Sequence, residues 1–160
     1  MIPDPARRGL ALAELFLRLS PRLFEEIEES GVLPRDPPGS PPVPVRAEWE
    51  CFALYACVRG LVAAGGFNRE TAAAIDALHE HALASAVGAT RAQISERYAE
   101  YGAIGEAGGK SGAATVTQRL GEAAARHMVA GEPPAALAEL VGALHESLAE
   151  GAAEAVRRAG

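Results

Sequence analysis

The sequence predicts an all-α protein, folded as a compact multi-helix bundle whose helices are mainly antiparallel. Alanine, the strongest helix former, supplies 35 of the 160 residues. Aromatic residues make up only 5% of the chain, and no segment shows the alternation of β-branched and polar residues that is typical of a half-buried strand. We therefore expect about five core helices, preceded by further helices near the N-terminus.

The N-terminal part is predicted to contain two short helices and a proline-rich connector. Residues 7–19 are amphipathic, and Pro21 suits the first turn of a second helix. These N-terminal helices together occupy residues 6–30. Residues 31–45 hold six of the eleven prolines, so this segment cannot be helical. We expect a connector that wraps the bundle; a docking peptide for an aromatic groove is the alternative.

Residues 46–159 are predicted to form the bundle core, which makes the whole chain, 1–160, a single helical domain. The start signals include an N-cap at Asn68 and a capping box formed by Thr90 and Gln93. Glycines and prolines divide the core into helices at about 46–64, 69–87, 91–104, 113–130 and 133–159. The short connections favour antiparallel packing of the first four.

Charge and hydropathy exclude several classes of partner. The formal net charge is −6 and the basic residues are scattered, whereas a nucleic-acid-binding protein needs a concentrated basic patch. No apolar run reaches the roughly 18–20 residues of a membrane span. The N-terminus lacks the basic and then apolar order of a secretory signal. We expect a cytoplasmic protein that has no cofactor and binds neither nucleic acid nor membrane.

The two cysteines, Cys51 and Cys57, are six residues apart in the helix predicted at 46–64. Six residues turn a helix by about 240°, so the two thiols point in different directions and cannot form a disulfide with each other. We expect both to be small apolar core residues.

Four consecutive predicted helices each place one ionisable side chain in an otherwise apolar face: Glu50, His79, Arg97 and His127. A buried charge must be paired or neutralised, so this pattern indicates a polar network or a site. With a rise of ~1.5 Å per residue and alternating helix directions, the four could meet inside the bundle. Tyr101 shares the face of Arg97 and completes the predicted ligand-binding set.

Three outcomes are compatible with such convergence. Glu50 and Arg97 could form a buried structural pair, the polar faces could meet a second subunit, or the residues could bind a ligand or a metal. The arginine favours an anionic ligand over a cation. Asp76-x-x-His79 is the one spacing that resembles a carboxylate–histidine metal motif. We predict no metal ligands and no catalytic residues.

Two further features are predicted to be structural. The segment Gly105–Ser111 superficially resembles a phosphate-binding loop, but its glycine spacing is one residue too short and it follows a helix. A loop between helices is the expected role, with anion contact at Lys110 and Ser111 as the alternative. His145 falls at the edge of the apolar stripe of the last helix, where we expect a histidine at the core boundary.

The leading functional hypothesis is a non-enzymatic interaction or scaffold module that self-associates as a homodimer or binds another protein. The helix at 46–64 supports it, because two apolar faces require either a central position or a dimer contact. The second of these faces consists of Trp49, Ala53, Ala56, Gly60 and Ala63. The runner-up is a bundle that binds a small anionic molecule or a metal, as a sensor or enzyme, through Glu50, Arg97 and the histidines.

Overall fold

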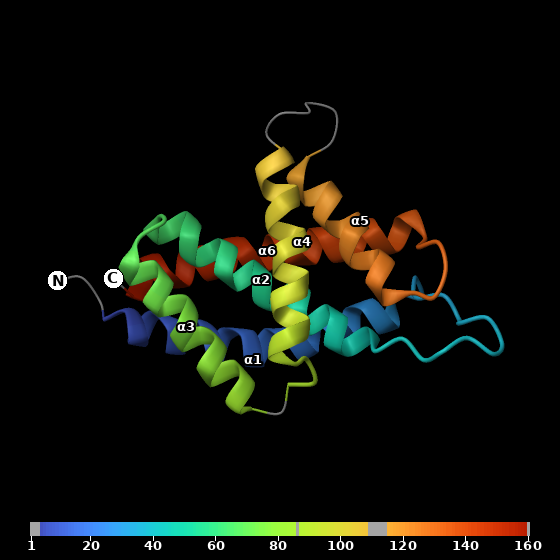
Figure 1. The fold of residues 1–160 in the computed structure, drawn as a ribbon, viewed down its shortest axis with the longest axis horizontal. Helices are drawn as coiled ribbons and strands as arrows, with labels where there is room; N and C mark the ends of the chain where they lie inside the picture. Colours follow the sequence, from blue (N-terminus) through green and yellow to red (C-terminus); the bar gives the residue numbers. More distant parts are fainter. Residues whose placement is uncertain (1–3, 86, 109–114, 160) are drawn as a thin grey trace.

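The computed structural model describes residues 4–85, 87–108 and 115–159, and within them it contains only α-helices and no strand. The predicted all-α bundle is therefore confirmed (Figure 1). The helices are α1 (Pro5–Glu29), α2 (Val45–Gly65), α3 (Arg69–Ala84), α4 (Arg91–Gly108), α5 (Val116–Met128) and α6 (Ala135–Ala159). None of them, as far as it is described, combines the length and the apolar composition needed to cross a membrane.

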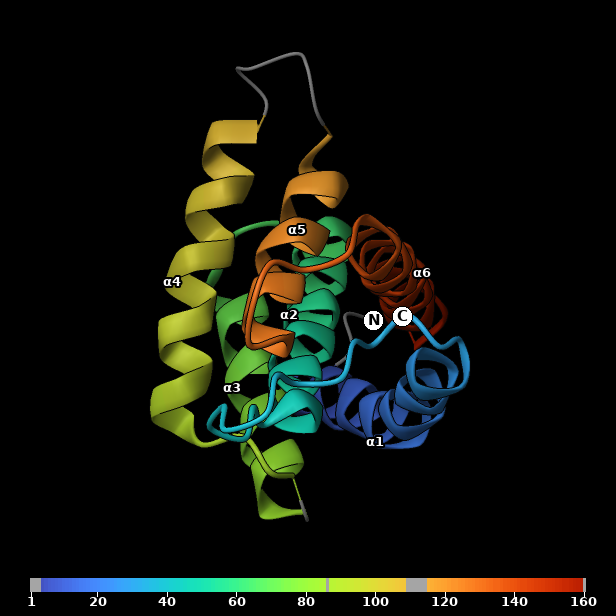
Figure 2. The same cartoon turned by 90° about the vertical axis from the view of Figure 1, so that its right-hand side faces the viewer.

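Helix α2 is the centre of the bundle and contacts all five other helices. In Figure 2 it lies between α4 on one side and α1 and α6 on the other. Its residues are buried all around the helix axis, so even the charged Glu48 and Glu50 are covered. Trp49 is completely buried, and its indole N–H donates to the carbonyl of Ser20 at 3.0 Å. Of the two alternatives predicted for this helix, a central position or a dimer contact, the structure shows the central position, and both of its apolar faces are occupied within the chain.

Helix α1 is continuous, so the prediction of two helices separated before Pro21 is wrong. Its buried residues keep a spacing of three or four across the proline: Leu12, Phe16, Ser20, Phe24 and Ile27. A proline inside a helix costs about 3 kcal/mol. Burial of one uninterrupted apolar stripe outweighs that cost, because each large side chain contributes roughly 1.5–3 kcal/mol.

Helices α3 and α4 pack little on each other, unlike the antiparallel neighbours predicted from their short connection. Helix α3 packs mainly on α1, where Gly9 brings the backbones close: a Cβ there would lie 2.4 Å from the carbonyl oxygen of Ala74. Helix α4 crosses α2 and α6 steeply (Figure 1). It continues to Gly108, beyond the predicted end at 104. Lys110 and Ser111, the predicted anion contacts, lie outside the described residues.

Two glycines set the distance between α6 and its neighbours. A Cβ at Gly60 of α2 would lie 2.5 Å from the Cβ of Ala152, and a Cβ at Gly121 of α5 would lie 2.4 Å from the carbonyl oxygen of Ala138. Gly142 of α6 faces Gly121 directly. Only residues without side chains permit such close approach of two helix backbones.

The predicted connector and N-cap are present. Residues 31–44 contain no helix, and a turn closes where the amide of Ser40 donates to the carbonyl of Pro37 at 3.0 Å. Gly39 adopts φ +85° in this turn, a conformation that a residue with a side chain rarely adopts. Asn68 caps α3 by accepting from the amide of Thr71 at 2.8 Å.

Both cysteines are buried core residues, as predicted, and neither forms a disulfide. Burial raises the pKa of each thiol, to about 12 for both Cys51 and Cys57. A thiol with so high a pKa is almost fully protonated at neutral pH, so neither side chain is a reactive nucleophile.

Candidate functional site

Of the five predicted site residues, Arg97 and His127 lie in one row of polar contacts along α4, whereas Glu50, His79 and Tyr101 have other partners or none. Arg97 binds Glu48, and Glu50 instead accepts a hydrogen bond from the amide of Gly88 at 3.0 Å. The predicted Glu50–Arg97 pair is therefore wrong. Consecutive residues of α2 differ by ~100° about the axis, so Glu48 and Glu50 point to nearly opposite sides. Because α2 is covered on every side, both carboxylates are buried, and only Glu48 faces α4.

Glu48 is a buried, hydrogen-bonded carboxylate that the sequence did not identify as part of the polar interior. The guanidinium of Arg97 donates to it in a bidentate manner, from Nε to Oε2 and from Nη2 to Oε1, each at 2.8 Å. The Gln93 amide donates to the same Oε1 at 3.1 Å. Burial alone would raise the pKa of Glu48, but the hydrogen bonds and the positive charge of Arg97 outweigh it and lower that pKa. Glu48 is therefore an ionised, buried carboxylate.

The start of α4 is arranged around this carboxylate. Thr90 caps the helix, since its hydroxyl accepts from the amide of Gln93 at 3.1 Å, as predicted. The Gln93 side chain, which the sequence assigned to a capping box, donates through its amide nitrogen to Glu48. Gln93 and Arg97 are four residues apart, on one face of α4, and this spacing is the sequence signal that could have located an acidic partner.

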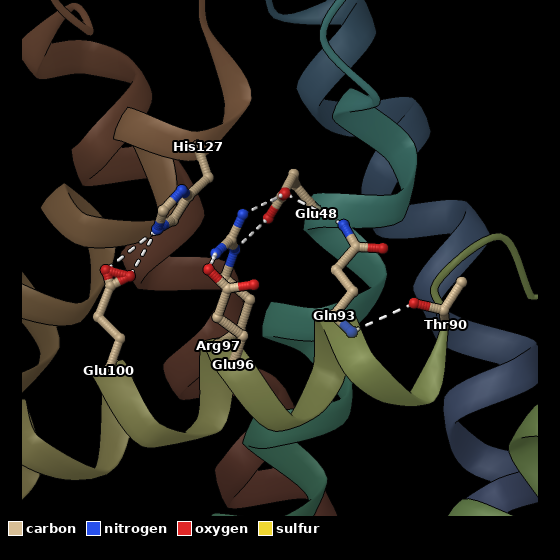
Figure 3. Close-up of polar contacts among 7 residues, drawn as sticks. All are labelled: Glu48, Thr90, Gln93, Glu96, Arg97, Glu100 and His127. Atoms are coloured by element: carbon tan, nitrogen blue, oxygen red, sulfur yellow. Dashed lines mark hydrogen bonds and ion pairs between the residues drawn. The ribbon is translucent and has the colours of Figure 1, made fainter.

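His127 of α5 pairs with Glu100 of α4. Its Nε2 lies 2.5 Å from Oε1 and 3.0 Å from Oε2 of the carboxylate, and both side chains are partly exposed. Figure 3 shows these groups in a row along α4, from Thr90 through Gln93, Arg97 and Glu96 to Glu100. Arg97 lies beside both Glu48 and Glu96, and Glu100 contacts His127, so the row joins α2, α4 and α5.

His79 of α3 forms a separate pair with Tyr98 of α4. Its Nε2 lies 2.8 Å from the tyrosine hydroxyl, and the two rings are tilted with centroids 5.4 Å apart. Burial lowers the pKa of His79, and the positive charge of Arg91 adds to this effect, whereas Asp76 opposes it. His79 is therefore neutral at pH 7.

His145 is completely buried, so the expected position at the core boundary is wrong. Its Nδ1–H donates to the carbonyl of Phe52 at 3.0 Å, and its ring stacks on that of Phe52 with centroids 4.0 Å apart. Burial lowers the pKa of His145 to about 3, with a smaller effect from the charge of Arg59. The ring belongs to an aromatic cluster that also contains Tyr55 and Tyr101.

Protonation of His145 is expected to destabilise the folded protein. The unfolded histidine has a pKa near 6.5, so below that pH the unfolded state takes up the proton and the folded state does not. The free energy of unfolding should therefore fall by about 2 kcal/mol between pH 6.5 and pH 5. Urea denaturation at these two pH values measures the fall.

His145→Asn is the matched variant, because its amide keeps a donor for the Phe52 carbonyl and does not titrate. Its free energy of unfolding should fall by less over the same interval, with the missing part equal to the His145 contribution. Identical falls for both proteins would show that His145 is not the group responsible.

Tyr101, the fifth predicted site residue, is completely buried, and among the described side chains its hydroxyl and the Nε2 of His145 have no hydrogen-bond partner. Burial strongly raises the pKa of Tyr101, so its hydroxyl stays protonated. In the part of the chain that the structure describes, no group of three His, Cys, Asp or Glu side chains could hold a metal ion. The polar residues thus form one row along α4 and a separate pair of His79 and Tyr98, and these contacts link neighbouring helices.

Comparison with known proteins gives no further constraint on function. No protein-family model matches the chain, and neither a curated protein nor a solved structure shows significant similarity to it.

Proposed function

We propose that the protein is a non-enzymatic interaction module that acts as a homodimer, in which Phe67 of each subunit enters a groove of the other. The observation that carries this proposal is the exposure of Phe67, whose ring is 93% accessible. A large aromatic side chain presented to solvent in this way is typical of an interface anchor.

The turn between α2 and α3 presents Phe67 in a fixed position. Gly66 adopts φ +77°, and the Asn68 side chain donates to the carbonyl of Gly65 at 2.7 Å while it caps α3. These contacts limit the conformational freedom that would be lost when the ring becomes buried. An aromatic side chain on a backbone held in this way needs a complementary hollow in the partner.

Such a hollow lies between α2 and α6, which we call the α2–α6 groove. It has a volume of about 590 Å³. The small residues in its lining are Ala63, Ala149, Gly151 and Ala153. These leave room for an aromatic ring. The groove begins beside the turn that carries Phe67, because its lining residue Ala63 is only four residues before Phe67. A two-fold axis near this end of the groove places the Phe67 ring of each subunit in the groove of the other.

The charges beside Phe67 and in the α2–α6 groove favour a second copy of this chain as the partner that fills the groove. Arg69 follows Phe67 closely and is exposed, and Glu150 is an exposed residue of the α2–α6 groove. Neither forms an ion pair within the described residues, whereas the other groove carboxylates Glu146 and Glu154 already bind Arg59 and Arg158. In the proposed dimer, Arg69 of one subunit pairs with Glu150 of the other.

Light scattering tests the proposal. The wild-type protein should have twice its chain mass of 16.6 kDa at micromolar concentrations, and Phe67→Ser should weaken the dimer by at least 30-fold. Leu10→Ser is the control, because among the residues that the structure describes Leu10 is the other exposed large apolar one, at 40%, and it lies outside the groove. A monomeric wild type, or a dimer unaffected by Phe67→Ser, would contradict the proposal.

Charge reversal identifies the orientation of the dimer. Arg69→Glu and Glu150→Arg should each weaken association, because each places like charges together, and the double variant should restore it. Failure of the double variant to recover would remove this pairing from the proposal.

Ligand binding by the interior residues has weaker support. Arg97 was the cation expected to hold an anion, and Glu48 already engages it through two hydrogen bonds. An anionic ligand would have to displace a buried, ionised carboxylate.

A further inference from the structure

We infer that a second groove, between α3 and α4, binds a small organic carboxylate that also carries a hydroxyl group. This α3–α4 groove has a volume of about 220 Å³. It is lined by His79, Leu83, Arg91, Ile94, Ser95 and Tyr98. It shares no lining residue with the α2–α6 groove and does not depend on dimer formation.

The spacing of the lining residues gives the groove a definite layout. Arg91, Ile94, Ser95 and Tyr98 follow the i, i+3, i+4, i+7 pattern, so they form one face of α4 over two helical turns, roughly 10 Å. His79 and Leu83 are one turn apart on α3. Because His79 contacts Tyr98, the polar pair occupies one end of the groove and Arg91 the other.

Arg91 provides the charge at its end of the groove. It is exposed at the start of α4, and in the described part of the chain it forms no ion pair. A guanidinium binds a carboxylate through two parallel hydrogen bonds, which makes this the preferred anion for such a site. The neighbouring His79 is neutral and does not compete for the anion.

The other end of the groove is suited to a hydroxyl group. One ring nitrogen of His79 is already engaged with the Tyr98 hydroxyl. If Nε2 accepts a hydrogen bond from the tyrosine O–H, the tyrosine oxygen can still accept a hydrogen bond from the ligand. If Nε2 instead donates to the tyrosine oxygen, the tyrosine O–H can still donate to the ligand. A ligand hydroxyl both donates and accepts, so it suits either arrangement.

The middle of the groove is apolar. Leu83 is half-buried and Ile94 is 5% exposed, and they come from opposite walls, α3 and α4. A short hydrocarbon or aromatic body between the two polar groups of the ligand would contact both side chains. The ligand class is therefore a compact hydroxylated monocarboxylate, for which 4-hydroxyphenylacetate is a suitable probe.

Titration of the ¹⁵N-labelled full-length protein with 4-hydroxyphenylacetate tests the inference by nuclear magnetic resonance. Saturable shifts should appear in the amides of α3 and α4 around His79 and Arg91. Phenylacetate, which lacks the hydroxyl, should bind more weakly, and inorganic phosphate should cause no saturable shift in these amides. Absence of saturable shifts with 4-hydroxyphenylacetate would overturn the inference.

Two variants distinguish a binding site from a structural contact. Arg91→Gln should weaken binding of the probe about tenfold, whereas Arg18→Gln, at an exposed arginine of α1, should not. Tyr98→Phe should abolish the preference for 4-hydroxyphenylacetate over phenylacetate and leave phenylacetate binding unchanged. Equal effects of the two arginine variants, or a preference that survives Tyr98→Phe, would overturn the assignment of these residues.

Discussion

Replacement of Arg97 by methionine is expected to lower the free energy of unfolding by about 3–5 kcal/mol. Glu48 is 5% exposed and ionised, and Arg97 neutralises it through two hydrogen bonds of 2.8 Å. Without the guanidinium, the protein must either bury an unpaired charge or protonate the carboxylate. Urea denaturation at pH 7 measures the loss.

Two controls separate burial from ion pairing in general. Arg158→Met removes an ion pair with Glu154 in which both side chains are largely exposed, so its effect should stay within about 0.5 kcal/mol. Combining Glu48→Leu with Arg97→Met removes both buried charges and should recover most of the stability. A loss from Arg97→Met no larger than that from Arg158→Met would contradict this account.

The Glu48–Arg97 pair also predicts that the free energy of unfolding depends on pH at values below those at which histidines titrate. Because the pKa of Glu48 is lower in the folded than in the unfolded protein, its stabilising contribution is complete above the unfolded value of 4.5 and disappears as the pH falls through the folded value. Arg97→Met should reduce this part of the acid denaturation, since the carboxylate then loses its partner.

Gly121→Ala is expected to cost about 3 kcal/mol, although it adds one methyl group. The new Cβ would lie 2.4 Å from the backbone oxygen of Ala138 and 3.1 Å from the Cα of Gly142. Backbone atoms cannot rotate away as a side chain can, so α5 and α6 must separate and lose the contacts along their interface. Thermal or urea unfolding gives the change in free energy.

Gly105→Ala, on α4 and outside the α2–α6 groove, is the matched control. Gly105 is exposed within the helix, and a Cβ there would meet nothing within 4 Å. Alanine restricts the unfolded chain more than glycine does, so this variant should gain about 0.5–1 kcal/mol. A comparable loss from both substitutions would show that helix packing is not the cause of the Gly121 effect.

Local signals predicted the elements whose boundaries depend on short-range chemistry. The cap at Asn68, the proline-rich connector and the position of α6 all follow from residues adjacent in sequence. Pro21 shows the limit of this approach, because the apolar stripe of α1 continues through it. Burial against α2, α3 and α6, which is long-range, decides that the helix continues.

The interior partners could not be predicted for a related reason. Counting polar residues within an apolar face misses those that lie between two such faces, and α2 is buried on all sides. Glu48 belongs to neither of the two apolar faces predicted for this helix, so the sequence did not single it out. His145 was placed at the boundary by the same counting, but Phe52 and Tyr55 of α2 cover its ring.

The central position of α2 also determines when the core can form during synthesis. Its small-residue face is closed by α6, which is the last helix described and comprises 25 residues. Ribosomes add about 5–20 residues per second, so α2 emerges well before α6 is complete. For those seconds the alanine-rich face of α2 has no partner, and the nascent chain is exposed to chaperones and proteases until α6 docks.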